Sequence, residues 1–221
     1  MSKIILTEKE IQNAINSSEK KYLEEQAKLQ EIYNTKGQGK ARDAAGKLTE
    51  SILAEIFDAI NLIISKKDLT LRSIVGSKDY LTCIINWNNK EGKSENLQVD
   101  RHVYLNDKRI AFIENKTYLD ACYYDRALSD FEKIIFTLKD DKDLGNIKFL
   151  VLSGQDAMSD KKRNFLESFF ELKLQKLGLP IPKYDVFYFL DGKRTSNKPI
   201  YNHCFDFNKA EIRRLILFLI N

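Results

Sequence analysis

Two carboxylates and one ammonium are spaced so that they could meet at the end of a β-hairpin. Asp100 precedes a stretch in which apolar and polar residues alternate, while Glu114 and Lys116 follow the apolar run 110–113. Between these two predicted strands, Asn106-Asp107 tolerates the left-handed backbone of a tight turn. In a hairpin, the two residue numbers of every cross-strand pair have the same sum. Asp100 should therefore lie opposite Glu114, or one residue away from that position. Because side chains alternate along a strand, Lys116 should emerge on the same face as Glu114.

This arrangement has a chemical use. Two nearby carboxylates repel each other, burial penalises their charged forms, and a hard divalent cation relieves both problems. Mg²⁺ takes oxygen ligands and commonly keeps several waters with only one or two protein carboxylates. A water activated by the metal beside a lysine can attack a phosphodiester. The alternative is an exposed cross-strand salt bridge, which would stabilise the fold by about 0–1 kcal/mol.

The acidic-x-Lys triplet alone carries little information in so lysine-rich a chain. Glu114-Asn115-Lys116 is distinguished by its place at the end of an apolar strand, with an acidic partner across a turn. The triplet occurs seven times, ending at Lys21, Lys93, Lys116, Lys142, Lys162, Lys173 and Lys193.

Asp100 together with Glu114-Asn115-Lys116 resembles the PD-(D/E)xK nuclease signature, with Val99 in place of the proline. The expected order of elements is a helix, a three-strand meander, a helix, a strand, and a further helix and strand. This order is similar to the common core of that superfamily over roughly residues 40–190. The small, basic chain is most similar to type II restriction endonucleases. The resemblance implies an α/β fold with a restriction-endonuclease-like core, in which helices flank a mixed central β-sheet of about five strands.

The resemblance also implies an activity, namely Mg²⁺-dependent hydrolysis of double-stranded DNA at a short specific sequence. Asp100 and Glu114 would bind Mg²⁺, for which Mn²⁺ can substitute, and Lys116 would orient or help deprotonate the attacking water. In this superfamily a glutamate on the first helix often reaches the metal. The segment 46–50 favours Glu50 for that role, with Glu55 as the alternative. No organic cofactor is expected. Two-fold symmetric DNA is most simply cut by a homodimer, and such an enzyme normally belongs to a restriction-modification system.

Three other interpretations remain open. A structure-specific or repair nuclease of the same fold would keep the metal site but recognise junctions or ends. A catalytically inactive DNA-binding protein would bind DNA without cutting it. An unrelated α/β protein carrying a chance motif would do neither.

Several segments could contact DNA. A glycine-rich basic stretch at 36–47 is interpreted either as a flexible interhelix linker or as a loop that contacts DNA phosphates. It is not a nucleotide-binding phosphate loop, because Leu48 stands where Ser or Thr should follow Gly46-Lys47. A second polar segment, 191–201, is either an ordinary turn or a base-reading loop. The predicted helix 118–138 adds aromatic and basic side chains near the cluster. The candidate DNA-binding residues are Gln38, Lys40, Arg42, Tyr118, Arg126, Lys193, Arg194, Asn197 and Lys198.

Composition sets outer limits on the protein class. The chain has 221 residues, 43% of them apolar and 31% charged, and a net charge of +4 permits a polyanionic partner without requiring one. No run of 18 apolar residues exists, so no membrane segment is expected. Three scattered cysteines and two histidines argue against a zinc site and favour a reduced, cytoplasmic protein.

We expect one nuclease domain over residues 1–221. Residues 1–35 would form an N-terminal helix at a dimer or DNA contact or on the domain surface, 40–190 the nuclease core, and 205–221 a C-terminal helix. The segment Thr7-Glu8-Lys9-Glu10 is predicted to be a capping box at the start of the N-terminal helix. Within the core, helical spacing predicts a helix over 41–64, and 80–87 is expected to be the first strand of the meander. The nearly all-apolar run 147–153 is typical of a central, doubly covered strand.

Overall fold

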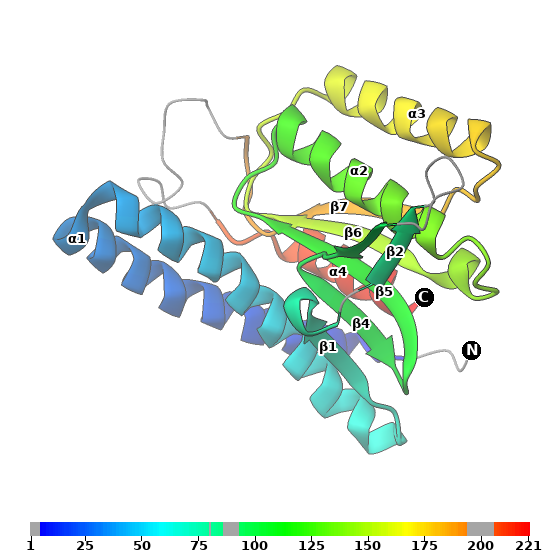
Figure 1. Ribbon diagram of the computed structural model, residues 1–221. Helices are drawn as coiled ribbons and strands as arrows, with labels where there is room; N and C mark the ends of the chain where they lie inside the picture. The colour runs from blue at the N-terminus through cyan, green and yellow to red at the C-terminus, as the bar shows by residue number, and fades with distance from the viewer. Residues whose placement is uncertain (1–4, 80, 86–92, 194–205) are drawn as a thin grey trace.

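A computed structural model describes residues 5–79, 81–85, 93–193 and 206–221 (Figure 1). Of residues 38, 39, 42, 77, 82–85 and 93–95 it describes only the backbone. No described helix combines the length and the apolar character that a bilayer span would need.

The N-terminal third of the chain is a helical hairpin. Helix α1 (Glu8–Ile64) folds back on itself at Gly37, whose φ of 76° interrupts the helix, and Figure 1 shows the two arms side by side. The expected capping box is present, with the Thr7 hydroxyl accepting from the Glu10 amide and the Glu10 carboxylate accepting from the Thr7 amide. The interpretation of 36–47 as a flexible linker is wrong, because only Gly37 leaves the helical conformation and the second arm begins directly after it.

The central sheet has five strands in the order β1-β4-β5-β6-β7. Strands β1 (Leu71–Val75), β4 (Arg101–Leu105) and β5 (Lys108–Lys116) are antiparallel neighbours. Strands β6 (Lys148–Ser153) and β7 (Lys183–Tyr188) then add in parallel. The prediction of an α/β fold with a mixed five-strand sheet flanked by helices is therefore confirmed.

Each face of the sheet is covered by its own pair of helices. On one face, α1 and α4 (Lys209–Ile220) pack against one side of β5, at Ala111 and Ile113. On the other face, α2 (Ala121–Thr137) and α3 (Asp160–Lys176) pack around Phe112. This division follows from the alternation of side chains along β5. All six residues of β6 are buried, as the apolar run predicts.

The apolar stripe of the first α1 arm is buried within this chain. Its residues belong to the same core as α4 and the second arm, so they are not a free surface for another subunit. The stripe consists of Ile11, Ile15, Tyr22 and Leu29.

The first strand of the meander was predicted wrongly. Residues Leu81–Ile85 do form a strand, β2, but it pairs with β3 (Lys93–Leu97) in a separate two-stranded sheet. The strand that pairs with β4 is β1, which no sequence pattern indicated. The β2–β3 hairpin is therefore an insertion between the first two strands of the meander. Three short 3-10 turns complete the described elements, at Ser65–Lys67, Gly76–Lys78 and Leu144–Asn146.

Candidate functional site

The turn between β4 and β5 fixes the register that brings the predicted side chains together. Asn106 and Asp107 both have positive φ, 45° and 63°, as a tight hairpin turn requires. Despite one irregularity after Val103, Arg101 pairs with Ile113. Asp100 and Glu114 are each one residue further from the turn, so the chain places them opposite each other, as predicted from the sequence.

The three side chains form one cluster. The Lys116 Nζ atom lies 2.5 Å from Glu114 Oε2 and 3.9 Å from Asp100 Oδ2. Asp100 Oδ2 also accepts a hydrogen bond of 2.7 Å from the backbone amide of Asn115. Because both carboxylate oxygens lie near one nitrogen, they can be no farther apart than the sum of those two distances. That upper limit exceeds the roughly 4 Å that separates two oxygens bound to one Mg²⁺, so a shared cation would require the carboxylates to close around it and the Lys116 ammonium to give way.

Burial sets the charge balance of the cluster. The Glu114 side chain is only 7% exposed, whereas that of Asp100 is 39% exposed. Burial raises the pKa of Glu114 to about 7, and the negative charges of Asp100 and Asp130 add to that rise while Lys116 opposes it. Near neutral pH the Glu114 carboxyl is therefore poised between its neutral and charged forms. A cation placed against it would favour the charged form.

The backbone at Asp100 is held by a turn that the sequence reasoning overlooked. The Gly76 amide donates to the Asp100 carbonyl oxygen at 3.0 Å. Gly76 packs so closely that a Cβ atom there would lie 1.6 Å from the Val99 carbonyl oxygen. Only glycine fits at this position without displacing the Val99–Asp100 peptide. The sequence shows only a glycine after β1, and the residues that this glycine contacts, Val99 and Asp100, are more than 20 positions away in the chain.

The same turn is anchored at its other end. Asp79 Oδ2 accepts a 2.5 Å hydrogen bond from the Tyr104 hydroxyl and lies 2.9 Å from Nδ1 of the fully buried His102. Both partners belong to β4, the strand that Asp100 precedes. The turn 76–79 therefore contacts β4 through Asp79 at one end and the Asp100 backbone through Gly76 at the other.

No third acidic ligand joins the cluster within the described residues. Among them, no group of three or more His, Cys, Asp or Glu side chains is arranged to hold a metal ion. Glu50 is exposed on the second arm of α1, and Glu55 is hydrogen-bonded to Ser17. The cluster can therefore offer two carboxylates to a cation, which matches the small number that Mg²⁺ uses in proteins.

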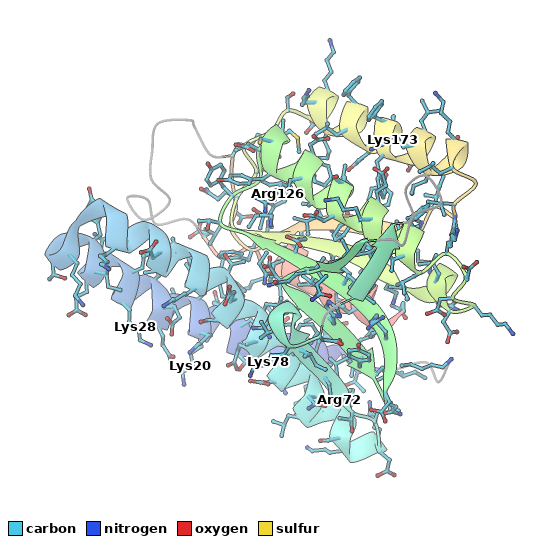
Figure 2. The ribbon with its side chains drawn as sticks, in the orientation of Figure 1. Lys20, Lys28, Arg72, Lys78, Arg126 and Lys173 are labelled. Carbon is cyan, nitrogen blue, oxygen red and sulfur yellow. The ribbon has the colours of Figure 1, made fainter. Side chains whose placement is uncertain are left out.

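The candidate DNA-binding residues are dispersed. Lys40 is exposed on α1, and Figure 2 shows Arg126 on α2. Tyr118 packs edge-on against Tyr123 at 5.3 Å. Lys193 lies 3.8 Å from Asp156 and 3.4 Å from Asp160, so it is a paired rather than a free cation. The side chains of Gln38 and Arg42, together with Arg194, Asn197 and Lys198, lie outside the described residues.

Three segments meet just beyond the strand ends near the cluster. Leu119 pairs with Asp156, and Asp156 pairs with Lys193, so the connections that follow β5, β6 and β7 lie side by side. The start of the segment 191–201 is therefore near the β5 end that carries Lys116. No protein-family model matches this chain, and no curated protein matches it significantly.

Proposed function

We propose that this protein is a Mg²⁺-dependent type II restriction endonuclease of the PD-(D/E)xK superfamily, which hydrolyses double-stranded DNA at a short specific sequence. The observation that carries the proposal is the meeting of Asp100, Glu114 and Lys116 at the end of a buried strand, with both carboxylates near one ammonium. A chance surface triplet would not be expected to bury its glutamate and to find an acidic partner across a hairpin.

The order of elements gives independent support. A long helix precedes an antiparallel meander of β1, β4 and β5, and α2, β6, α3 and β7 follow in turn. This order resembles the restriction-endonuclease-like core, although the meander uses β1 and carries the β2–β3 hairpin as an insertion. The triplet lies at the end of the third meander strand, which is where the signature falls in that core.

Each residue of the cluster has a chemical role in the proposed reaction. Asp100 and Glu114 supply the oxygen atoms that would hold Mg²⁺. When bound, Mg²⁺ would stabilise charge on the phosphate oxygens and favour loss of a proton from water. The Asn115 amide holds the Asp100 carboxylate in place. Lys116 would orient the attacking water and stabilise developing negative charge. Glu50 remains a candidate further ligand, although among the described residues it is not grouped with Asp100 and Glu114.

The proposed partners follow from the same activity. DNA phosphates would be contacted by exposed cations such as Lys40 and Arg126, and base contacts would come from the segment that begins near Lys193. A homodimer would place one cluster on each strand of a symmetric site. The cluster itself does not depend on these assignments.

Digestion of plasmid and phage DNA with and without Mg²⁺ tests the proposal. We expect discrete fragments whose ends map to one short sequence. Cleavage directed by junctions or ends would instead indicate a structure-specific or repair nuclease. DNA binding without cleavage would indicate an inactive DNA-binding protein, and neither activity would indicate a chance motif.

Matched variants link any cleavage to the cluster. Glu114→Ala and Lys116→Ala should each abolish cutting, because one removes a cation ligand and the other the ammonium. The double variant Asp140→Ala/Lys142→Ala is the control, since it removes a triplet of the same pattern from an exposed turn. Wild-type cutting by either cluster variant would refute the site.

A further inference from the structure

The outer surface of α3 is unusually apolar for an exposed helix. Phe165, Phe169 and Leu172 are 59%, 51% and 44% exposed, and the chain continues past the helix to the exposed Leu177 and Ile181. In Figure 1, α3 is the outermost element on its side of the sheet. Five of the eleven large apolar side chains that are exposed in the described part of the chain fall in this one segment. The exposed apolar residues are therefore concentrated here and not scattered singly over the surface.

The two phenylalanines are ordered with respect to each other. Their rings are 6.3 Å apart and nearly parallel, at 6°. The ammonium of Lys162 lies 5.2 Å from the Phe165 ring, and that of Lys173 lies 5.8 Å from the Phe169 ring. A lysine therefore lies near each ring, but the Lys173 ammonium is also paired with the Glu132 carboxylate of α2.

The acidic residues of α3 do not neutralise this surface. Glu167 and Glu171 accept hydrogen bonds from the hydroxyls of Tyr124 and Tyr184, on the side of the helix that faces the core. Asp160 pairs with Lys193. The carboxylates that α3 itself carries are thus occupied elsewhere. Asp125 and Glu132 of α2 line the cleft beside Phe169, and Glu132 is paired with Lys173, so the positive charge of the outer face lies at the two ends of the helix.

Lysines lie at both ends of the helix. Lys161, Lys162 and Lys176 are exposed and form no ion pair within the part of the chain that the structure describes. Since both ends are basic, a second copy of this chain would bring lysines against lysines in either a parallel or an antiparallel arrangement. Like charges placed together oppose such pairing.

We propose that the outer face of α3 (Phe165, Phe169 and Leu172, flanked by Lys161, Lys162 and Lys176) is a docking surface for an acidic segment of another protein that carries large apolar side chains. The rings and Leu172 would bury the partner's apolar residues, and the lysines would pair with its carboxylates. A nucleic acid fits less well, because Leu172, Leu177 and Ile181 offer no stacking surface for bases. This surface is independent of the proposed nuclease activity.

Binding of a designed probe to the full chain tests the proposal. The probe is a labelled amphipathic helix of about 18 residues with Leu and Phe on one face and Glu elsewhere, and its counterpart replaces every Glu by Lys. We expect the acidic probe to bind at least about ten-fold more tightly than the basic one, as measured by fluorescence anisotropy.

Variants identify the surface that binds. Phe165→Gln/Phe169→Gln and Lys162→Glu/Lys176→Glu should each weaken binding of the acidic probe by about ten-fold or more. Leu62→Gln is the control, because Leu62 is 70% exposed but lies on α1. All these positions are exposed, so circular dichroism should show that each variant keeps its fold.

Several results would overturn the proposal. These are absence of probe binding, equal affinity for the two probes, or unchanged binding by the Phe165→Gln/Phe169→Gln variant. A dimer that this variant converts to monomer in sedimentation experiments would assign the face to a second copy. Single-stranded DNA binding that the same variant loses would assign it to nucleic acid.

Discussion

Replacing Gly76 by alanine is expected to displace Asp100 and to remove most DNA cleavage without altering any member of the ionisable cluster. The added Cβ atom would lie 1.6 Å from the Val99 carbonyl oxygen and 2.8 Å from its carbonyl carbon. Carbon and oxygen atoms do not approach so closely, so the peptide must move by more than about 1 Å before the contact becomes tolerable.

That movement should fall on Asp100 rather than on the turn. Asp79, at the end of the turn, is held by Tyr104 and lies against the buried His102, so the turn cannot easily withdraw. The Val99 carbonyl belongs to the peptide that leads into Asp100, so its displacement shifts the Asp100 backbone and changes the position of the carboxylate relative to Lys116. A misplacement of about 1 Å in a catalytic group can cost on the order of 100-fold in rate.

The assay is the initial rate of plasmid linearisation at saturating Mg²⁺. We expect Gly76→Ala to cut about 100-fold more slowly than the wild type. Overpacking should also cost about 1–3 kcal/mol of unfolding free energy, and urea denaturation would show whether the variant remains folded.

Gly46→Ala is the matched control. Nothing lies within 4 Å of a Cβ at Gly46, which is helical, so this variant should cut normally and gain up to about 1 kcal/mol of stability. A folded Gly76→Ala protein that cuts at the wild-type rate would refute the idea that this turn positions Asp100.

Three further predictions concern the cluster itself. Because the folded pKa of Glu114 is raised from 4.5 to about 7, its native form binds the extra proton and stability falls as pH rises through that range. In EDTA, the free energy of unfolding of Glu114→Gln should therefore rise by up to about 3 kcal/mol relative to that of the wild type as the pH increases from 5 to 8. A difference in unfolding free energy that stays constant with pH would contradict this. Mg²⁺ should raise the melting temperature of the wild type but not of Asp100→Ala, and an equal rise in both would place the ion elsewhere. Lys116→Met should lose cleavage yet keep this Mg²⁺-dependent rise, whereas loss of both would show that Lys116 also organises the ligands.

The hairpin could be predicted because its determinants are local. The left-handed turn at 106–107 and the alternation on both sides of it fix which residues face each other, and the cluster follows from that register. The same holds for the capping box at Thr7 and for the doubly covered strand β6, whose patterns are contained within a few residues.

Other features depend on contacts that no local pattern encodes. In β1 only Leu71 is buried, so that strand lacks the alternation that marks a half-buried strand. The pairing of β2 with β3 depends on where the inserted hairpin packs against α2. In the sequence, Gly76 is an ordinary glycine at the end of a strand. Only the folded structure shows that a side chain cannot be accommodated there, because the Val99 carbonyl lies against it.

The stretch 36–47 illustrates a different limit. It contains three glycines, yet only Gly37 adopts a left-handed φ, and Gly46 lies within a helix. Burial of Ala41 and Ala45 against the first arm outweighs the weak helix propensity of glycine there. Packing between the two arms therefore decided the conformation of a segment that composition alone would make a loop.

The central claim is that Asp100 and Glu114 share one cation, and anomalous diffraction from crystals grown with Mn²⁺ tests it most directly. We expect a single strong peak about 2 Å from a carboxylate oxygen of each residue, and no peak there in crystals of Glu114→Ala. A peak that contacts neither carboxylate, or no peak between them at saturating Mn²⁺, would contradict the claim.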